Sequence, residues 1–116
     1  MTLYAGGCHC GRIAFEADTE LREVIDCNCS MCGKRGGLLA FVPAERARLK
    51  MPESDLATYT FNTHHVRHHF CPVCGIAPFS RGSDRAGKET WSINVRCLDG
   101  VDPSTLTVKH HDGRSA

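Results

Sequence analysis

Long apolar segments, net charge and helical periodicity are scarce in this sequence. No apolar run approaches the roughly 20 residues that cross a bilayer, so we expect no membrane-spanning helix. The 14 basic and 13 acidic side chains give a net charge of +1, which argues against a nucleic-acid-binding protein. The segment Met1–Gly6 lacks the basic and apolar regions of a signal peptide. We therefore expect a cytoplasmic protein whose thiols stay reduced.

The composition and the residue pattern predict one small, mostly-β domain over residues 1–116. The chain is 41% hydrophobic and 23% charged, as ordinary globular proteins are. Short segments alternate apolar and polar residues between frequent turns, which is typical of half-buried strands. A helical turn is expected only within residues 44–50. The predicted strands span residues 12–17, 21–26, 38–42, 56–61, 64–70, 76–81, 90–97 and 106–108.

Three of these strands carry further expectations. Pro78 predicts an edge position for the strand at 76–81, because proline cannot donate to a neighbouring strand. The alternation in 64–70 places Val66, His68 and Phe70 on one face. The strand at 90–97 turns Trp91, Ile93, Val95 and Cys97 to one side, so we expect Cys97 to be a buried core thiol.

Cysteine is abundant, and three of the eight cysteines fall within six residues: Cys27, Cys29 and Cys32. Cys29 and Cys32 can wrap one tight turn around a metal ion. Cys27, two residues earlier on an arriving strand, would point to the same side. Three protein ligands with a free position are typical of a catalytic zinc site. Two alternatives stay open: a structural zinc completed by Cys97 or a histidine, and a Cys-x-x-Cys redox pair.

Four further cysteines form two pairs, each followed by glycine: Cys8 and Cys10, then Cys71 and Cys74. Together they supply the four thiolates of a closed, structural zinc site. Such a site would clamp two turns about 60 residues apart, and closing so long a loop constrains the unfolded chain strongly. Buried thiols or disulfides are the alternatives. Seven thiolates with two zinc ions would bring the net charge to about −2.

Other polar residues are weaker candidates. Lys34, Arg35 and Arg96 could hold the carboxylates of a small thiol such as glutathione, since guanidinium groups bind carboxylates bidentately. Four histidines at 64, 65, 68 and 69 would split between two faces of a strand, so we expect them to be solvated or packed rather than to share one ion. No general base is identifiable from the sequence.

The order and spacing of the motifs resemble one known family. Gly7-Cys8-His9-Cys10-Gly11, Cys27-Asn28-Cys29-Ser30-Met31-Cys32, Phe70-Cys71-Pro72-Val73-Cys74-Gly75 and Asn94-Val95-Arg96-Cys97-Leu98 are similar to those of the glutathione-dependent formaldehyde-activating enzyme family, or CENP-V/GFA domain. The resemblance runs from about residue 6 to 103.

The resemblance implies a β-tent fold, in which antiparallel sheets are held at an angle by a structural zinc. It implies that Cys8, Cys10, Cys71 and Cys74 bind this zinc and that Cys27, Cys29 and Cys32 bind the catalytic one. The implied reaction is that of a carbon–sulfur lyase, which joins formaldehyde to glutathione as S-hydroxymethylglutathione. This chain looks shorter than the namesake enzyme at its C-terminal side.

Two hypotheses follow for the function. The first is a zinc-dependent enzyme with two ions per chain, whose partners are a small thiol, glutathione or a similar one, and a small aldehyde. The second is a non-catalytic scaffold or interaction module in which both zinc ions are structural. The cysteine motifs predict which residues bind metal, but they do not identify the substrate. The sequence leaves homo-oligomerisation open.

Overall fold

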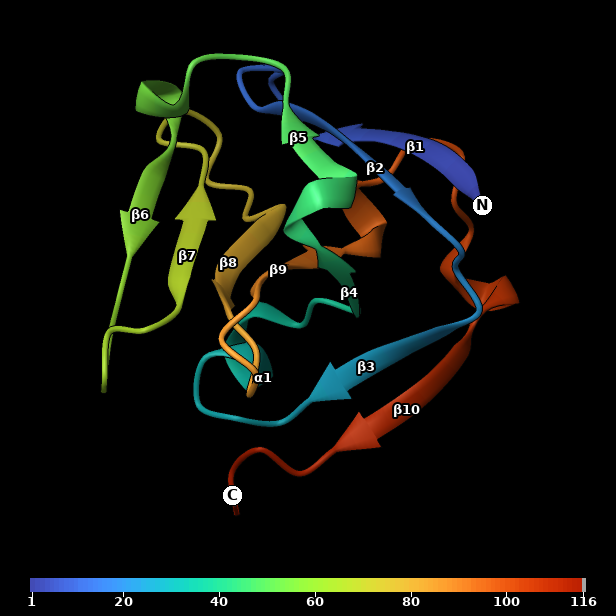
Figure 1. The fold of residues 1–116 in the computed structure, drawn as a ribbon, viewed down its shortest axis with the longest axis vertical. Helices are drawn as coiled ribbons and strands as arrows, with labels where there is room; N and C mark the ends of the chain where they lie inside the picture. Colours follow the sequence, from blue (N-terminus) through green and yellow to red (C-terminus); the bar gives the residue numbers. More distant parts are fainter. Residues whose placement is uncertain (116) are drawn as a thin grey trace.

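Two β-sheets make up most of the computed structural model, which describes residues 1–115 (Figure 1). These residues form ten strands, one four-residue α-helix and four 3-10 helices. The predicted mostly-β fold with little helix is confirmed. Within the described residues, no helix has the length and apolar content needed to cross a membrane.

The smaller sheet has three antiparallel strands, with β2 in the middle. In spatial order these are β1 (Thr2–Gly7), β2 (Ala14–Thr19) and β5 (Ala47–Leu49). Alternate residues on and beside β2, namely Ile13, Phe15 and Ala17, are buried, as the sequence pattern predicts. This sheet therefore turns one face to the core.

The larger sheet has seven strands, and its neighbours are antiparallel except for the pair β10–β3. In spatial order its strands are β10 (Thr107–His111), β3 (Glu23–Cys27), β4 (Leu39–Pro43), β9 (Glu89–Asn94), β8 (Phe79–Ser83), β7 (Arg67–Phe70) and β6 (Ala57–Tyr59). The helix α1 (Cys32–Arg35) links β3 to β4. The 3-10 helices are η1 (Ala44–Arg46), η2 (Glu53–Asp55), η3 (Val95–Cys97) and η4 (Pro103–Thr105).

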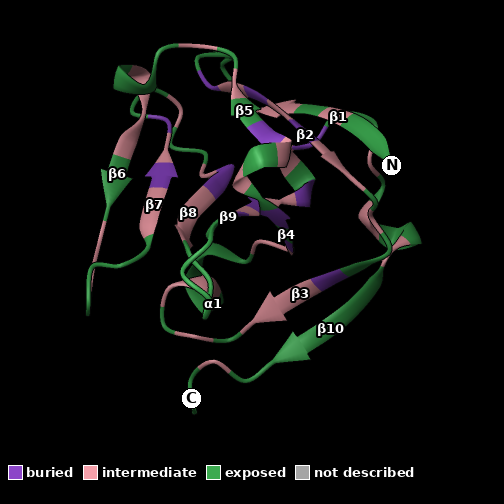
Figure 2. Cartoon of the chain, viewed as in Figure 1, coloured by how far each residue is buried: buried purple, intermediate pink, exposed green. Residues whose placement is uncertain are grey.

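Aromatic side chains join the two sheets in the core. The Phe15 ring of β2 lies 5.3 Å from that of Phe79 and 6.1 Å from that of Trp91, measured between ring centroids. Phe79 and Trp91 stack at 4.4 Å. Burying one such side chain contributes about 1.5–3 kcal/mol. Figure 2 shows buried residues on strands of both sheets, including β2, β4, β7 and β9, while β10 and much of β6 are exposed.

Several strands differ from the sequence-based prediction. β8 lies between β7 and β9 and is not an edge strand. Pro78 lies just before β8, so the missing N–H of the proline costs no hydrogen bond between strands. The Pro78 carbonyl accepts a hydrogen bond from the Asn94 N–H at 2.9 Å. The strand predicted at 90–97 ends at Asn94. There the Asn94 side chain accepts from the Arg96 N–H at 3.2 Å and caps a 3-10 turn.

The remaining differences concern the extent of the sheets. The strands β1 and β5 have no counterpart in the prediction, and the helical turn expected at 44–50 covers only η1 before β5 begins. β7 begins at Arg67, so Val66 precedes the strand, and the fully packed histidine is His69. The sheets also reach beyond the expected core of residues 6–103, from β1 to β10.

Candidate metal centres and active-site cavity

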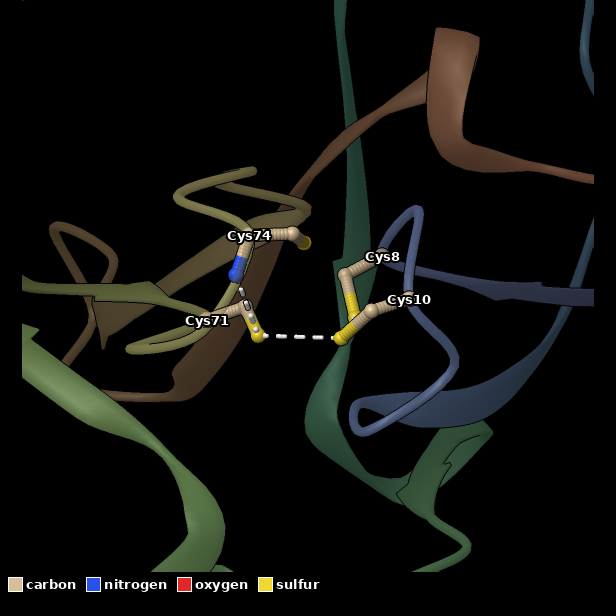
Figure 3. A group of neighbouring side chains, drawn as sticks. All are labelled: Cys8, Cys10, Cys71 and Cys74. Carbon is tan, nitrogen blue, oxygen red and sulfur yellow. Dashed lines mark hydrogen bonds between the residues drawn. The ribbon is translucent and has the colours of Figure 1, made fainter.

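Four thiols meet where the two sheets approach each other (Figure 3). Cys8 and Cys10 lie in the turn after β1, and Cys71 and Cys74 lie in the turn after β7. Their sulfur atoms are all within 4.8 Å of one another. The Cys10 and Cys71 sulfurs are 3.5 Å apart and those of Cys8 and Cys10 are 3.7 Å apart. We call this group the four-thiol centre.

The donor set fits a tetrahedral zinc ion. Zn–S bonds of roughly 2.3 Å place the sulfurs of such a site about 3.8 Å apart. Backbone N–H groups point at the sulfurs: those of Val73 and Cys74 each lie 3.4 Å from the Cys71 Sγ, and that of Ile13 lies 3.2 Å from the Cys8 Sγ. Such donors stabilise thiolates. The backbone N–H of Ile76 is the main cause that lowers the pKa of Cys74 to about 6.

Three thiols meet at the end of β3. Cys27 is the last residue of that strand, and Cys32 is the first residue of α1. The sulfurs of Cys27, Cys29 and Cys32 lie within 4.8 Å of one another, and within residues 1–115 no fourth histidine, cysteine or carboxylate side chain joins the group. The turn is held by the Gly33 N–H, which donates to the Cys29 carbonyl at 2.8 Å. We call this group the three-thiol centre.

The protonation tendencies of the three-thiol centre also fit a bound cation. Burial is the largest cause that raises the pKa of Cys32 to about 12, and the neighbouring Cys29 and Cys27 add to it. Burial alone would raise the pKa of Cys29 as well, but hydrogen bonds from the Cys32 backbone and side chain hold it below its usual value. Without an ion, it is unfavourable for neighbouring thiols of this centre to be deprotonated at the same time, because the thiolates repel one another. A divalent cation would remove that penalty, because bound thiols lose their protons.

A cavity of about 740 Å³ opens beside the three-thiol centre. Cys27 and Cys32 line it, together with Met31 and Arg35 of the connection to β4. Its floor is the face of the larger sheet opposite the core, as the alternation of exposed and buried residues along β4 and β9 requires. The volume lies within the range of pockets that hold small organic ligands.

The cavity floor has an apolar and a polar side. Phe41 and Leu39 of β4 line the apolar side, and Phe41 is 58% exposed, which is unusual for a residue in the middle of a sheet. The strand register places Phe41 beside Ser92, Ser92 beside Ser80, and Ser80 beside His68. The sheet thus changes from apolar to polar as it runs from β4 to β7.

The three cations predicted to hold carboxylates occupy different places. Arg35 lies at the end of α1 and lines the cavity. Lys34 lies on the same helix and Arg96 lies in η3, but neither is among the cavity-lining residues within 1–115. Burial lowers the pKa of Arg35, and the charge of Cys32 opposes this shift. The Arg35 charge in turn adds to the lowering of the His68 pKa, so Arg35 is close enough to influence both a thiol and an imidazole. Arg81 and Arg85 line the cavity as well, together with Asp84, and Arg81 is paired with the Glu53 carboxylate.

The histidine cluster divides in a way that the sequence analysis did not resolve. His69 is buried. Its Nε2 accepts from Arg81 Nε at 2.9 Å, and its Nδ1 lies 2.9 Å from the Thr58 hydroxyl. His68 lines the cavity, with its Nδ1 3.1 Å from the Ser80 hydroxyl. Burial, and then the Arg35 charge, lower the pKa of His68, so its ring is neutral at pH 7. His68 and His69 are neighbours on one strand, so their side chains point to opposite faces of the sheet. This alternation could have predicted that one histidine is buried and the other lines the cavity.

The eighth cysteine stays outside both centres. Cys97 lies in η3 and is half-buried rather than part of the core, which corrects the prediction. Burial raises the pKa of Cys97 to about 11, and the charges of Cys8 and Cys74 add to this. Cys97 is thus a protonated neighbour of the four-thiol centre. It does not complete the three-thiol centre.

Two comparisons with known proteins agree with this description. The profile of a family described as "Glutathione-dependent formaldehyde-activating enzyme" matches residues 3–111, nearly the whole chain. A crystal structure of a Rhodobacter sphaeroides protein superposes with a TM-score of 0.78 at 29% sequence identity. The alignment covers 90% of this chain and 99% of the other.

Proposed function

The chain belongs to the glutathione-dependent formaldehyde-activating enzyme family, and from that premise we propose that it is a zinc-dependent enzyme of the carbon–sulfur lyase type. Its substrates would be glutathione, or a similar small thiol, and an aldehyde. The observation that carries the proposal is the three-thiol centre at the wall of a ligand-sized cavity, without a fourth protein ligand among the described residues. A closed structural site would not leave a position for a substrate.

The two thiol centres would have separate roles. Cys8, Cys10, Cys71 and Cys74 would hold a structural zinc, and Cys27, Cys29 and Cys32 would hold the catalytic one. Zinc held by the three sulfurs would supply the positive charge that keeps a co-substrate thiol in its thiolate form. In the proposed step the thiolate sulfur attacks the carbonyl carbon and forms a carbon–sulfur bond. The carbonyl π electrons move to the oxygen, which takes up the proton that the thiol released.

Residues of this chain would orient the reactants. Arg35 lines the cavity with Cys32 and would pair with a carboxylate of the thiol substrate, as a guanidinium does bidentately. Neutral His68, across the polar floor, can accept the thiol proton and return it to the carbonyl oxygen. Lys34 and Arg96 remain weaker candidates, because they do not line the cavity.

The apolar side of the floor favours a carbonyl compound that carries an apolar substituent. Formaldehyde has one carbon and would leave the walls around Phe41, Leu39 and Ile76 unfilled. Each buried methylene group contributes about 0.8 kcal/mol to binding. An alkyl or aryl aldehyde would therefore be preferred over formaldehyde by this enzyme, with the thiol on the polar side.

Exchange spectroscopy tests the proposed function directly. Glutathione and ¹³C-labelled aldehyde equilibrate with their hemithioacetal in solution, and magnetisation exchange measures the rate. We expect the zinc-loaded protein to accelerate this exchange and zinc analysis to give two ions per chain. Unchanged exchange, together with a second ion bound by four protein ligands in X-ray absorption spectra, would contradict the proposal and favour the non-catalytic scaffold.

A further inference from the structure

The segment that follows β10 lies against the three-thiol turn and is tied to it through Asn28. The backbone N–H of Asn28 donates to the His111 carbonyl at 3.1 Å. Its side-chain amide Nδ2 donates to the Asp112 carboxylate at 3.0 Å, and its Oδ1 accepts from the Arg114 N–H at 3.0 Å. The backbone N–H and both polar side-chain atoms of Asn28 therefore form hydrogen bonds with this segment.

Gly113 places the backbone of this segment directly on the sulfurs. A Cβ atom at Gly113 would lie 2.8 Å from the Cys27 Sγ and 3.2 Å from the Cys29 Cβ. The first distance is well inside van der Waals contact, so any other residue would displace the sulfur or the segment. Gly113 is not among the glycines with positive φ. Glycine is therefore needed at this position because there is no room for a side chain, and not because of the backbone conformation.

The pairing of β10 with β3 explains how the segment reaches this place. The two strands run parallel, and their register sets His111 opposite Cys27. The strand β10 is exposed along its length, so it contributes little to the core. Its pairing with β3 brings residues 111–114 to the three-thiol turn.

We propose that the segment His111–Arg114 is part of the three-thiol centre, with Asn28 and Gly113 as its positioning residues. The proposal rests on the proposed function, in that the three thiols hold an ion. The segment fixes the separation of the sulfurs and covers Cys27 on one side. The ligand position then faces the cavity, which Cys27, Cys32 and His111 line together.

A pair of glycine variants tests the proposal. Gly113→Ala adds a methyl group against Cys27. Gly33→Ala is the control, because it keeps the N–H that donates to the Cys29 carbonyl and its methyl group would lie 3.6 Å from the nearest atom, the Asn28 carbonyl oxygen, an ordinary contact. Neither glycine has a positive φ, so alanine brings no left-handed backbone strain at either position. Zinc affinity of each centre is measured by competition with a chromophoric chelator, and Co²⁺ substitution reports the coordination geometry in the d–d bands.

We expect Gly113→Ala to weaken metal binding at the three-thiol centre by roughly 10–100-fold, as loss of supporting contacts does. Its Co²⁺ bands should change, while Gly33→Ala should keep wild-type affinity and spectrum. The four-thiol centre in the same chain serves as the internal reference for folding. Asp112→Ala removes one Asn28 partner without adding bulk, and we expect a smaller loss of the same kind.

Equal metal affinity and equal Co²⁺ spectra in wild type, Gly113→Ala and Asp112→Ala would overturn the positioning role. If Gly113→Ala disturbs folding, Asp112→Ala alone decides by the same measurement. A wild-type protein that holds no second ion would instead contradict the proposed function. In that case alkylation rates of Cys27, mapped by mass spectrometry, decide the role of the segment: faster alkylation in Asp112→Ala supports it and equal rates overturn it.

Discussion

The two thiol centres use the same donor atom but differ in how far along the chain they reach. The four-thiol centre joins turns about 60 residues apart, one beside each sheet, and its Cys71 has no exposed surface. The three-thiol centre takes all its sulfurs from one turn, its cysteines are half-buried, and Cys27 and Cys32 line the cavity. One centre is positioned to connect the fold and the other to meet a ligand.

The difference in loop length suggests separate roles for the two centres, one in the stability of the fold and the other in ligand binding. A cross-link stabilises a protein mainly by closing a loop in the unfolded chain, and the gain grows with loop length. A zinc ion in the four-thiol centre would close a long loop, whereas the span from Cys27 to Cys32 is short enough to be restricted already. We therefore expect the fold to depend little on how tightly the three-thiol centre holds an ion, so this centre can keep one ligand position open.

The largest effect is expected when the long-range clamp is broken. Cys71→Ser should lower the free energy of unfolding by about 2–5 kcal/mol, the range for loss of a cross-link over a long loop. Thermal unfolding and zinc content measure this. Cys97→Ser is the matched control, because Cys97 is a nearby half-buried thiol outside the cluster. Equal melting temperatures for the two variants would mean that the four-thiol centre does not clamp the sheets.

Breaking the local centre should give the reverse pattern. Cys32→Ser should remove the second zinc and abolish the acceleration of hemithioacetal exchange, while the free energy of unfolding changes by no more than about 1 kcal/mol. Zinc analysis, exchange spectroscopy and thermal unfolding on one preparation check all three. Cys32→Ser protein that unfolds as readily as Cys71→Ser would show that both centres support the fold.

The sequence was sufficient to predict both thiol centres, because ligand spacing is a local property. Pairs two or three residues apart can meet at one ion only in a turn, and the glycines after Cys10 and Cys74 mark such turns. The strands with clear alternation, such as β2, were also predictable. The order of the strands in the sheet could not be predicted. Pro78 suggested an edge strand, but it lies just before β8, a central strand, where its missing N–H has no effect.

The cavity could not be predicted, because it depends on pairings between distant strands. The approach of Phe41, Ser92, Ser80 and His68 on one face follows from register across four strands. The contact of Gly113 with Cys27 has the same origin, since the parallel pairing of β10 with β3 carries it there. The last strand predicted from the sequence ends at residue 108, before this segment begins.

Metal removal should distinguish the centres by rate. With a strong chelator in excess, we expect zinc release in two phases of equal amplitude, the faster from the three-thiol centre by roughly tenfold or more. A site with an open position lets the chelator attack the ion, whereas four protein ligands exclude it. Absorbance of the chelator complex gives the rates. Activity lost together with the fast phase would assign that phase, and a single phase would contradict the difference between the centres.

Within the cavity, Arg35 should affect thiol binding more than chemistry. Arg35→Ala should raise the KM for glutathione about tenfold, the loss of one charge-assisted hydrogen-bonded pair, with little change in kcat. Arg35→Lys should recover part of this. Arg22→Ala is the control, because Arg22 is an exposed cation that does not line the cavity and is not a candidate for the thiol site. Equal KM values for the Arg35 and Arg22 variants would remove Arg35 from the thiol site.

The smallest effect is expected at the apolar side of the floor. Phe41→Ser should lower kcat/KM for an aryl or alkyl aldehyde by a few-fold, about 1 kcal/mol, and leave that for formaldehyde nearly unchanged. Val108→Ser is the matched control, because Val108 is an exposed apolar residue on β10 that does not line the cavity. The ratio of the two kcat/KM values is the quantity to compare, since it cancels any general loss of active protein. If Phe41→Ser lowers both values equally, Phe41 supports the sheet rather than the aldehyde, and the three-thiol centre would serve a one-carbon substrate.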